Sequence, residues 1–269
     1  MDNIIKTLCE EFKLRYEQTE NTVKLMDEGN TIPFIARYRK EVTGNLDDQL
    51  LRELFERLTY LRGLAKRKEE VLSSMETLGV LTDELKEKVE SAKTMTEVED
   101  IYRPFRPKRK TRASVARERG LEGLALLIME QRVKYQPSIE EEAAAYVSEE
   151  KDVADAAAAI AGACDIIAED VSDNAEFRKE LRRLTFEFGT LSTKQAKEED
   201  SVYAQYYEYA EPLKKVLPHR VLAINRGEKE DFLKVDVSVS SDIVLNYLYS
   251  QILLGNKSPA EPYVSAAIL

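Results

Sequence analysis

Residues 22–41 read TVKLMDEGNTIPFIARYRKE and predict two helices joined by a tight turn. Gly29 ends the first helix, since glycine just past the last turn is a common stop signal. Thr31 can cap the second helix, and Pro33 suits its first turn, where a missing N–H costs little. The result is the outline of a helix-turn-helix over about 19–42, with cations on the second helix. Many helical hairpins that bind nothing share this outline.

The rest of the chain is predicted to be mainly helical. Asn45 caps a long helix whose apolar seam continues to Met75 and which Gly79 ends. The alanine-rich segment 152–170 should pack closely against a neighbouring helix. The chain has only 10 glycines and 8 prolines, and this composition favours helices over strands and turns. Further helices are expected at 2–14, 82–92, 94–101, 113–118, 121–131, 138–147, 173–187 and 241–254.

One short segment has the pattern of a β-strand. Within 232–239, Leu233, Val235 and Val237 alternate with polar residues, which is the period of a half-buried strand. A strand needs a partner, and 186–193 is the best candidate. We therefore expect a mainly α, multi-helical fold with a small β element near these two segments. The expected domains are 1–112, which holds the helix-turn-helix-like segment, and 113–269, which holds the β element.

Composition places the chain among soluble cytosolic proteins. Its 269 residues suffice for one or two domains with a substantial core. Cys9 and Cys164 lie far apart in a chain without a signal peptide, which is typical of reduced cytosolic thiols. No apolar run approaches the roughly 20 residues that cross a bilayer. We expect a cytoplasmic location.

Charge is divided unevenly along the chain. The net charge is −10, but residues 1–120 carry 24 Lys and Arg against 23 Asp and Glu, whereas 121–269 carry 16 against 27. The cations gather in 103–119, where Glu118 is the only acidic residue. An acidic protein can still bind a polyanion through such a local cluster. The cations of this segment are Arg103, Arg106, Lys108, Arg109, Lys110, Arg112, Arg117 and Arg119.

The segment 103–119 is the strongest binding candidate by composition. Pro104 and Pro107 predict an extended connector with accessible side chains, and clustered cations bind phosphate by releasing counterions. Tyr102 and Phe105 could stack on unpaired bases or anchor the connector in the core. The alternative is a solvated loop whose arginines pair with acidic residues of the same protein. The candidates here are Arg103, Arg106, Lys108, Arg109, Lys110 and Arg112.

A second cationic candidate lies in the opening stretch. Arg37, Arg39 and Lys40 could contact phosphate, with Tyr38 and Phe34 as packing residues. The alternative is that these cations form ion pairs, because Glu41, Asp47 and Asp48 follow closely.

Catalytic and metal-binding patterns are not found in the sequence. His219 is the only histidine, so a nucleophilic triad would depend on it alone. No CxxC, HExxH or GxxxxGK[ST] motif occurs. We expect a protein that is not an enzyme and that uses no metal and no cofactor.

Four blocks, in order along the chain, carry a resemblance to a known family. They are 22–41 (quoted above), 56–62 (ERLTYLR), 101–113 (IYRPFRPKRKTRA) and 219–230 (HRVLAINRGEKE). Together they resemble the Tex family of bacterial transcription accessory proteins. The resemblance implies a cytoplasmic, non-catalytic factor that acts with nucleic acid, RNA more than DNA, and with the transcription or translation machinery.

The resemblance also implies that much of the protein lies beyond this sequence. Family members continue into a YqgF-type domain, a helix-hairpin-helix region and an OB-fold RNA-binding domain, through which most nucleic-acid contact is expected. The chain stops at Leu269 in an apolar run without a stop signal, so we expect truncation there. The alternative function is a helical scaffold that positions those domains and contacts protein partners without binding nucleic acid itself.

Overall fold

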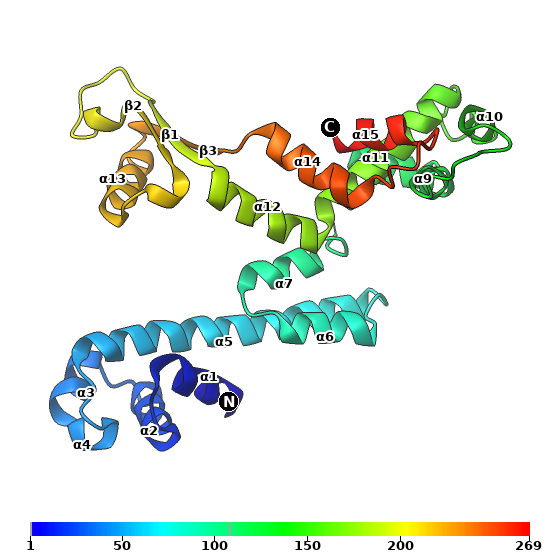
Figure 1. Cartoon of the computed structure of the whole chain (residues 1–269). Helices are drawn as coiled ribbons and strands as arrows, with labels where there is room; N and C mark the ends of the chain where they lie inside the picture. Colours follow the sequence, from blue (N-terminus) through cyan, green and yellow to red (C-terminus); the bar gives the residue numbers. More distant parts are fainter. Residues whose placement is uncertain (1, 108) are drawn as a thin grey trace. The chain divides into compact units, whose positions relative to one another are not determined.

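The computed structural model describes residues 2–107 and 109–269 and is mainly α-helical, as predicted (Figure 1). It divides into two compact units, residues 1–102 (unit 1) and 103–269 (unit 2). The division places the whole cationic segment 103–119 in unit 2. The domain boundary expected after residue 112 stays a prediction.

Unit 1 consists of helices around a leucine-rich core. The long helix α5 provides Leu51, Leu54 and Leu58, and these pack with Leu8 of α1 and Ile35 of α3. Leucine at three- and four-residue spacing puts these side chains on one face of α5. The helices are α1 (Asp2–Phe12), α2 (Tyr16–Asp27), α3 (Ile32–Tyr38), α4 (Lys40–Thr43), α5 (Asp48–Thr77), α6 (Asp83–Ser91) and α7 (Met95–Tyr102).

The start of α5 differs from the sequence-based prediction. Asn45 does not cap it, because Asn45 follows Gly44 in the left-handed turn that ends α4. Asp47 is the cap, and its carboxylate accepts a hydrogen bond from the Leu50 N–H at 2.8 Å. An Asn or Asp at either position would satisfy the capping pattern, so the sequence alone does not separate them.

The second helix of the opening stretch is shorter than predicted. α3 ends at Tyr38, Arg39 has φ −130° and ψ 28°, and a new short helix, α4, begins at Lys40. Only Arg37 of the three cations therefore lies within α3. The change of direction carries Thr43 into the interior, where it is fully buried and its hydroxyl donates to the Arg39 carbonyl at 3.2 Å.

Unit 2 is organised around the alanine-rich helix α11. Ala159 and Ala163 are fully buried, and α8, α9, α10 and α15 all contact this helix, so the predicted close packing is confirmed. The helices are α8 (Arg112–Glu118), α9 (Glu122–Met129), α10 (Ile139–Ala144), α11 (Ala156–Asp173), α12 (Ala175–Phe188), α13 (Pro218–Lys229), α14 (Ser241–Ile252) and α15 (Glu261–Ile268), with short 3₁₀ turns η1 (Ala204–Tyr206) and η2 (Leu213–Lys215).

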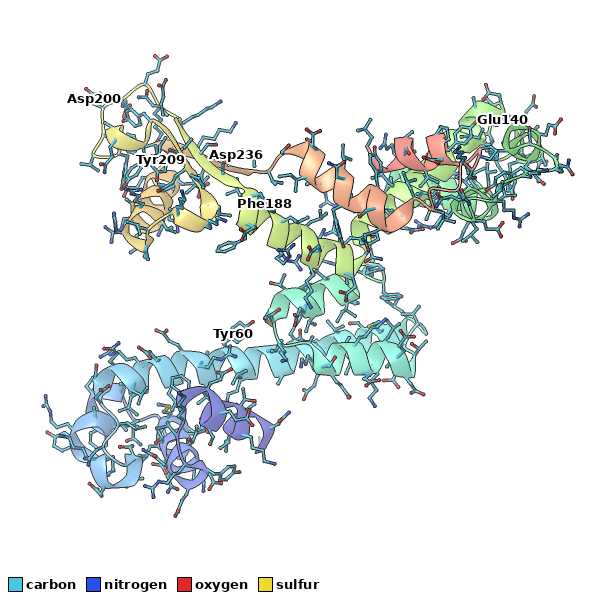
Figure 2. All side chains as sticks on the ribbon, viewed as in Figure 1. Tyr60, Glu140, Phe188, Asp200, Tyr209 and Asp236 are labelled. Atoms are coloured by element: carbon cyan, nitrogen blue, oxygen red, sulfur yellow. The ribbon has the colours of Figure 1, made fainter. Side chains whose placement is uncertain are left out.

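A small antiparallel sheet extends from the end of α12. Its strands are β1 (Thr190–Gln195), β2 (Glu208–Pro212) and β3 (Leu233–Ser238), in the order β2-β1-β3. The predicted pairing is confirmed, with Leu191 opposite Val237. The predicted boundary is wrong at one end, because α12 continues through Phe188, labelled in Figure 2.

The third strand of this sheet, β2, was not predicted from the sequence. Its inward positions hold Tyr209 and Glu211 rather than aliphatic residues. Glu211 can occupy such a position because the Arg220 guanidinium of α13 donates to it at 2.7 Å. The strand therefore lacks the apolar alternation by which strands are recognised.

Candidate nucleic-acid interface

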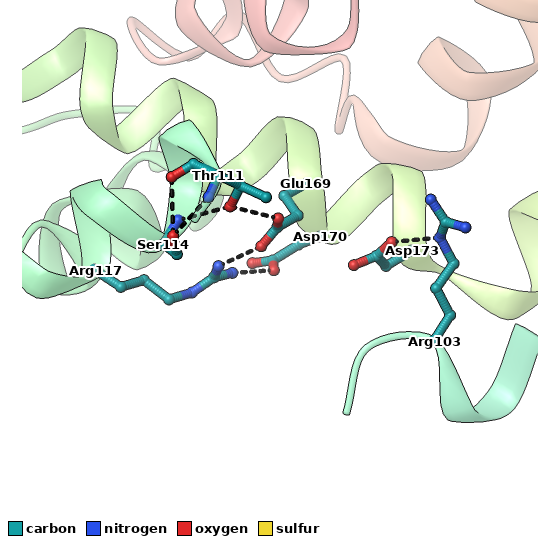
Figure 3. A network of polar contacts seen from close by, with 7 residues as sticks. All are labelled: Arg103, Thr111, Ser114, Arg117, Glu169, Asp170 and Asp173. Atoms are coloured by element: carbon teal, nitrogen blue, oxygen red, sulfur yellow. Dashed lines mark hydrogen bonds and ion pairs between the residues drawn. The ribbon is translucent and has the colours of Figure 1, made fainter. Parts of the chain in front are cut away.

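The segment 103–119 is attached to helix α11 through its arginines (Figure 3). Nε of Arg103 donates to Oδ1 of Asp173 at 2.7 Å, and only 7% of the Asp173 side chain is exposed. Asp173 is the last residue of α11, so this pair fixes the start of the segment to that helix.

Arg117 forms the second attachment, from helix α8. Its guanidinium donates to Glu169 at 2.6 Å and also to Asp170. The other Glu169 oxygen accepts a hydrogen bond from the Thr111 hydroxyl at 3.0 Å. That hydroxyl also caps α8, since it accepts from the Ser114 N–H. One carboxylate thus holds both the first turn of α8 and an arginine near its end.

The two α11 carboxylates that face Arg117 differ in environment. The Glu169 side chain is 17% exposed, whereas that of Asp170 is 65% exposed. Partial loss of water raises the pKa of the Asp170 carboxyl; Arg117 opposes this rise, and the neighbouring Glu169 adds to it. Glu169 is therefore the main partner of Arg117.

Of the remaining cations, Arg112 and Lys110 are more exposed than Arg103 and Arg117. Arg112 lies 3.3 Å from Asp165, and Lys110 lies 3.6 Å from Glu118. Arg119 pairs with Asp152. Arg106 and Arg109 form no ion pair with any residue that the structure describes, and Lys108 lies outside the described residues.

The carboxylates that pair with these arginines were not predicted from the sequence. Asp165, Glu169 and Asp173 follow one another at four-residue spacing, which places them along one face of α11. This spacing is visible in the sequence. The arrangement matches the alternative in which the arginines pair with acidic residues of the same protein.

The second candidate, around α3, has a different environment. Within the described chain, no carboxylate forms an ion pair with Arg37, Arg39 or Lys40. This includes Glu41, which we considered as a partner. The other two acidic residues that we considered are engaged elsewhere. Asp47 caps α5, and Asp48 pairs with Arg52 at 2.6 Å.

Aromatic rings accompany these cations. The rings of Phe34 and Tyr38 lie 5.3 Å apart between centroids. Cζ of Arg39 lies 5.2 Å from the Phe34 centroid, and Cζ of Arg37 lies 5.9 Å from that of Tyr38. Tyr38 is 56% exposed, so its ring is an open surface rather than a core anchor. Tyr102, by contrast, is buried beneath Arg67 and offers no stacking surface.

Sites for other chemistry are not found in the described part of the chain. No group of His, Cys, Asp and Glu there could hold a metal ion. His219 is exposed in the first turn of α13. No described helix combines the length and apolar character needed to cross a membrane.

Two family models match the chain. One, described as the Tex-like protein N-terminal domain, matches residues 2–76, and the other, described as Tex central region-like, matches residues 135–253. Together they cover unit 1 as far as the end of α5 and most of unit 2.

Relatives match nearly the full chain. Over 91% of this chain, the sequence is 45% identical to the uncharacterized protein YdcI of Bacillus subtilis. Over 89% of this chain, it is 40% identical to Protein tex of Bordetella pertussis. It is 29% identical to the human S1 RNA-binding domain-containing protein 1 over 90% of its length. These matches cover 34%, 30% and 25% of the respective relatives, so the chain spans about a third of their length or less.

Proposed function

Because the chain belongs to the Tex family, we propose that it serves transcription as a non-catalytic accessory region that associates with nucleic acid. The name transcriptional accessory protein Tex, carried by a relative from Neisseria gonorrhoeae, supports the role in transcription. The human relative is named for an S1 RNA-binding domain, and this name favours RNA over DNA as the ligand of the whole protein. Most of that contact is assigned to parts of the relatives that this chain does not match.

One observation supports direct contact by this chain and assigns it to α3. Arg37, Arg39 and Lys40 have no carboxylate partner among the described residues, and aromatic rings lie beside Arg37 and Arg39. Arg106 and Arg109 also lack a carboxylate partner but have no such ring contact among the described residues, whereas Arg103 and Arg117 donate to carboxylates of α11. Phosphate binding gains most from cations whose donors face solvent and counterions. An arginine that already donates to a carboxylate has fewer N–H groups left for a phosphate, and its charge is partly neutralised.

A second function, the helical scaffold, is favoured by the attachment of 103–119 to α11. Arg103 and Arg117 bind side chains 70 and 52 positions away in the chain. Ion pairs between residues so far apart in the chain stabilise the packing of the segment 103–119 on α11. In this function the basic segment is structural, and unit 2 holds further domains or protein partners in position.

A salt titration separates the two functions. The probe is a fluorescein-labelled RNA of about 20 uridines, with binding followed by anisotropy. The test variant is R37Q/R39Q/K40Q. The control is R52Q/K66Q/K88Q, which removes the same charge from exposed cations of unit 1. Because the net charge of −10 opposes binding, we expect wild-type affinity in the micromolar range or weaker at moderate salt.

We expect the α3 variant to bind more weakly and to lower the slope of log K against log salt by about 2, since each lost phosphate contact removes about 0.7–0.9. The control should keep the wild-type slope. Equal behaviour of the two variants, or no binding by the wild type at low salt, would leave the scaffold function in place of direct contact. A DNA oligonucleotide of the same length tests the preference for RNA.

A further inference from the structure

We propose that the α3 surface binds single-stranded nucleic acid, with an unpaired base stacked on Tyr38 and phosphates held by Arg37 and Arg39. This inference rests on the proposed function and names its ligand class. The surface consists of Phe34, Arg37, Tyr38 and Arg39, and we call it the α3 surface.

The ring of Tyr38 is open to solvent. Tyr38 ends α3 and is 56% exposed, although Phe34 packs beside it. Covering an exposed aromatic ring with a planar group lowers the free energy. Base–aromatic stacking contributes about 1–3 kcal/mol of binding free energy per base. The Arg37 guanidinium lies near this ring, and its N–H groups can donate hydrogen bonds to a phosphate.

Other arginine–aromatic pairs of unit 1 differ from those on the α3 surface. Arg57 lies 5.1 Å from the Tyr60 centroid, but it also donates two hydrogen bonds to Glu11. Arg67 lies 5.8 Å from the Tyr102 centroid and donates to Glu99. In both pairs the arginine therefore already has a carboxylate partner within the protein.

The two pairs on the α3 surface lack such a carboxylate among the described residues. Arg39 donates to the neighbouring Tyr38 carbonyl at 3.2 Å, and no described carboxylate binds Arg37. Their guanidinium groups therefore keep donors for an external anion, next to rings that can receive a base. This combination of cation and open ring is the composition of single-strand binding surfaces.

The composition and length of α3 favour unpaired bases over base reading in a duplex. The exposed residues of α3 are Pro33, Arg37 and Tyr38, so Arg37 is the only one among them of the types that read a base edge through two hydrogen bonds. The helix is also only 7 residues long. A tyrosine ring can stack on a base only where that base is not already stacked on both sides in a duplex. The surface is therefore suited to unpaired bases.

The test compares variants of Tyr38 on three probes. These are the uridine RNA above, a DNA duplex of equal length and a single strand of abasic DNA, which keeps phosphates and lacks bases. Y38L removes the ring and keeps an apolar side chain, whereas Y38F keeps the ring. The control is F55A, which removes another exposed aromatic residue of unit 1. Far-UV circular dichroism verifies folding.

We expect Y38L to weaken RNA binding about 5-fold or more, which corresponds to the lower end of the stacking range. Y38F and F55A should bind RNA as the wild type does, and Y38L should leave duplex and abasic binding unchanged. Equal loss on all three probes, or no loss on RNA, would overturn the inference. If R37Q/R39Q/K40Q weakens binding while Y38L does not, the proposed function stands and base stacking is wrong. If the wild type binds no probe, both are wrong.

Discussion

Arg103 and Asp173 form a hydrogen-bonded ion pair at 2.7 Å across 70 positions of the chain, with the carboxylate almost fully buried. Asp173 ends α11, so the pair joins the basic segment 103–119 to the central helix of unit 2. A buried carboxylate without its partner is costly, since it loses water without gaining a cation. The pair is thus a structural element, and it explains why a cluster of cations need not be a binding surface.

Glu169 should contribute more to stability than its neighbour Asp170. Glu169 accepts from Arg117 and Thr111 and is mostly shielded, whereas Asp170 is largely exposed. We expect E169Q to lower the free energy of unfolding of unit 2 by about 1–2 kcal/mol and D170N by less than about 0.5 kcal/mol. Urea unfolding, followed by hydrogen exchange of α11 peptides, measures both. Equal effects would show that Arg117 has no preferred partner.

Gly227 should resist substitution because its helix packs closely on the sheet. An added Cβ would lie 2.6 Å from Cδ1 and 2.9 Å from Cγ of Leu233, and 3.1 Å from Cγ of Tyr203. Overpacking of this kind costs about 1–3 kcal/mol, more than the helix propensity that alanine adds. We expect G227A to lower the melting temperature of unit 2.

The matched control is Gly63 in the interior of α5, where an added Cβ meets no atom within 4 Å. Alanine there should stabilise unit 1 by about 0.5–1 kcal/mol. Stabilisation by both substitutions would mean that Leu233 and Tyr203 can move aside freely.

Two ion pairs should make unit 1 sensitive to acid. Hydrogen bonds from Arg57 and Arg62 lower the pKa of the Glu11 and Asp27 carboxyls. A lowered folded pKa contributes stability that is present above the unfolded pKa, about 4.3 for Glu and 3.9 for Asp, and is lost as the pH falls through the folded pKa. We expect R57Q/R62Q to melt below the wild type at about pH 6, with the gap closing toward about pH 3. A gap independent of pH would contradict this.

Chelation should not affect this chain. The described residues contain no cluster of His, Cys, Asp and Glu able to hold a metal, and His219 is the only histidine of the sequence. We expect the same melting temperature with and without EDTA, and no nuclease, NTPase or protease turnover. A metal-dependent rise in melting temperature, or turnover that H219A abolishes, would show that the protein is an enzyme or a metalloprotein.

Local patterns were sufficient to predict most of the helices and the pairing of β1 with β3. The seam of α5 and the alternation in 232–239 depend on neighbouring residues, which the sequence displays directly. The break at Arg39 was not predictable in this way, because it accompanies the burial of Thr43, which depends on the packing of unit 1 and not on neighbouring residues alone.

The sequence was sufficient to predict which charged residues the candidate site contains. It was not sufficient to predict which of them pair with one another. The sequence displays the cations of 103–119, and it also displays the stripe Asp165, Glu169 and Asp173. That the two face each other depends on the packing of α8 against α11, which brings together residues more than 50 positions apart. On α3 the acidic neighbours were visible, but their use in capping α5 and in pairing with Arg52 was not.

Arg103 and Arg117 hold the segment 103–119 against α11, and the whole account depends on this attachment. A double-mutant cycle on Arg103 and Asp173, with R103Q, D173N and the double variant, measures it most directly. Urea unfolding followed by hydrogen exchange of α11 peptides gives the four free energies of unfolding. We predict a coupling energy of about 1–2 kcal/mol, between the values of exposed and buried pairs. A coupling energy near zero would contradict the structural role and return Arg103 to the cations available for phosphate.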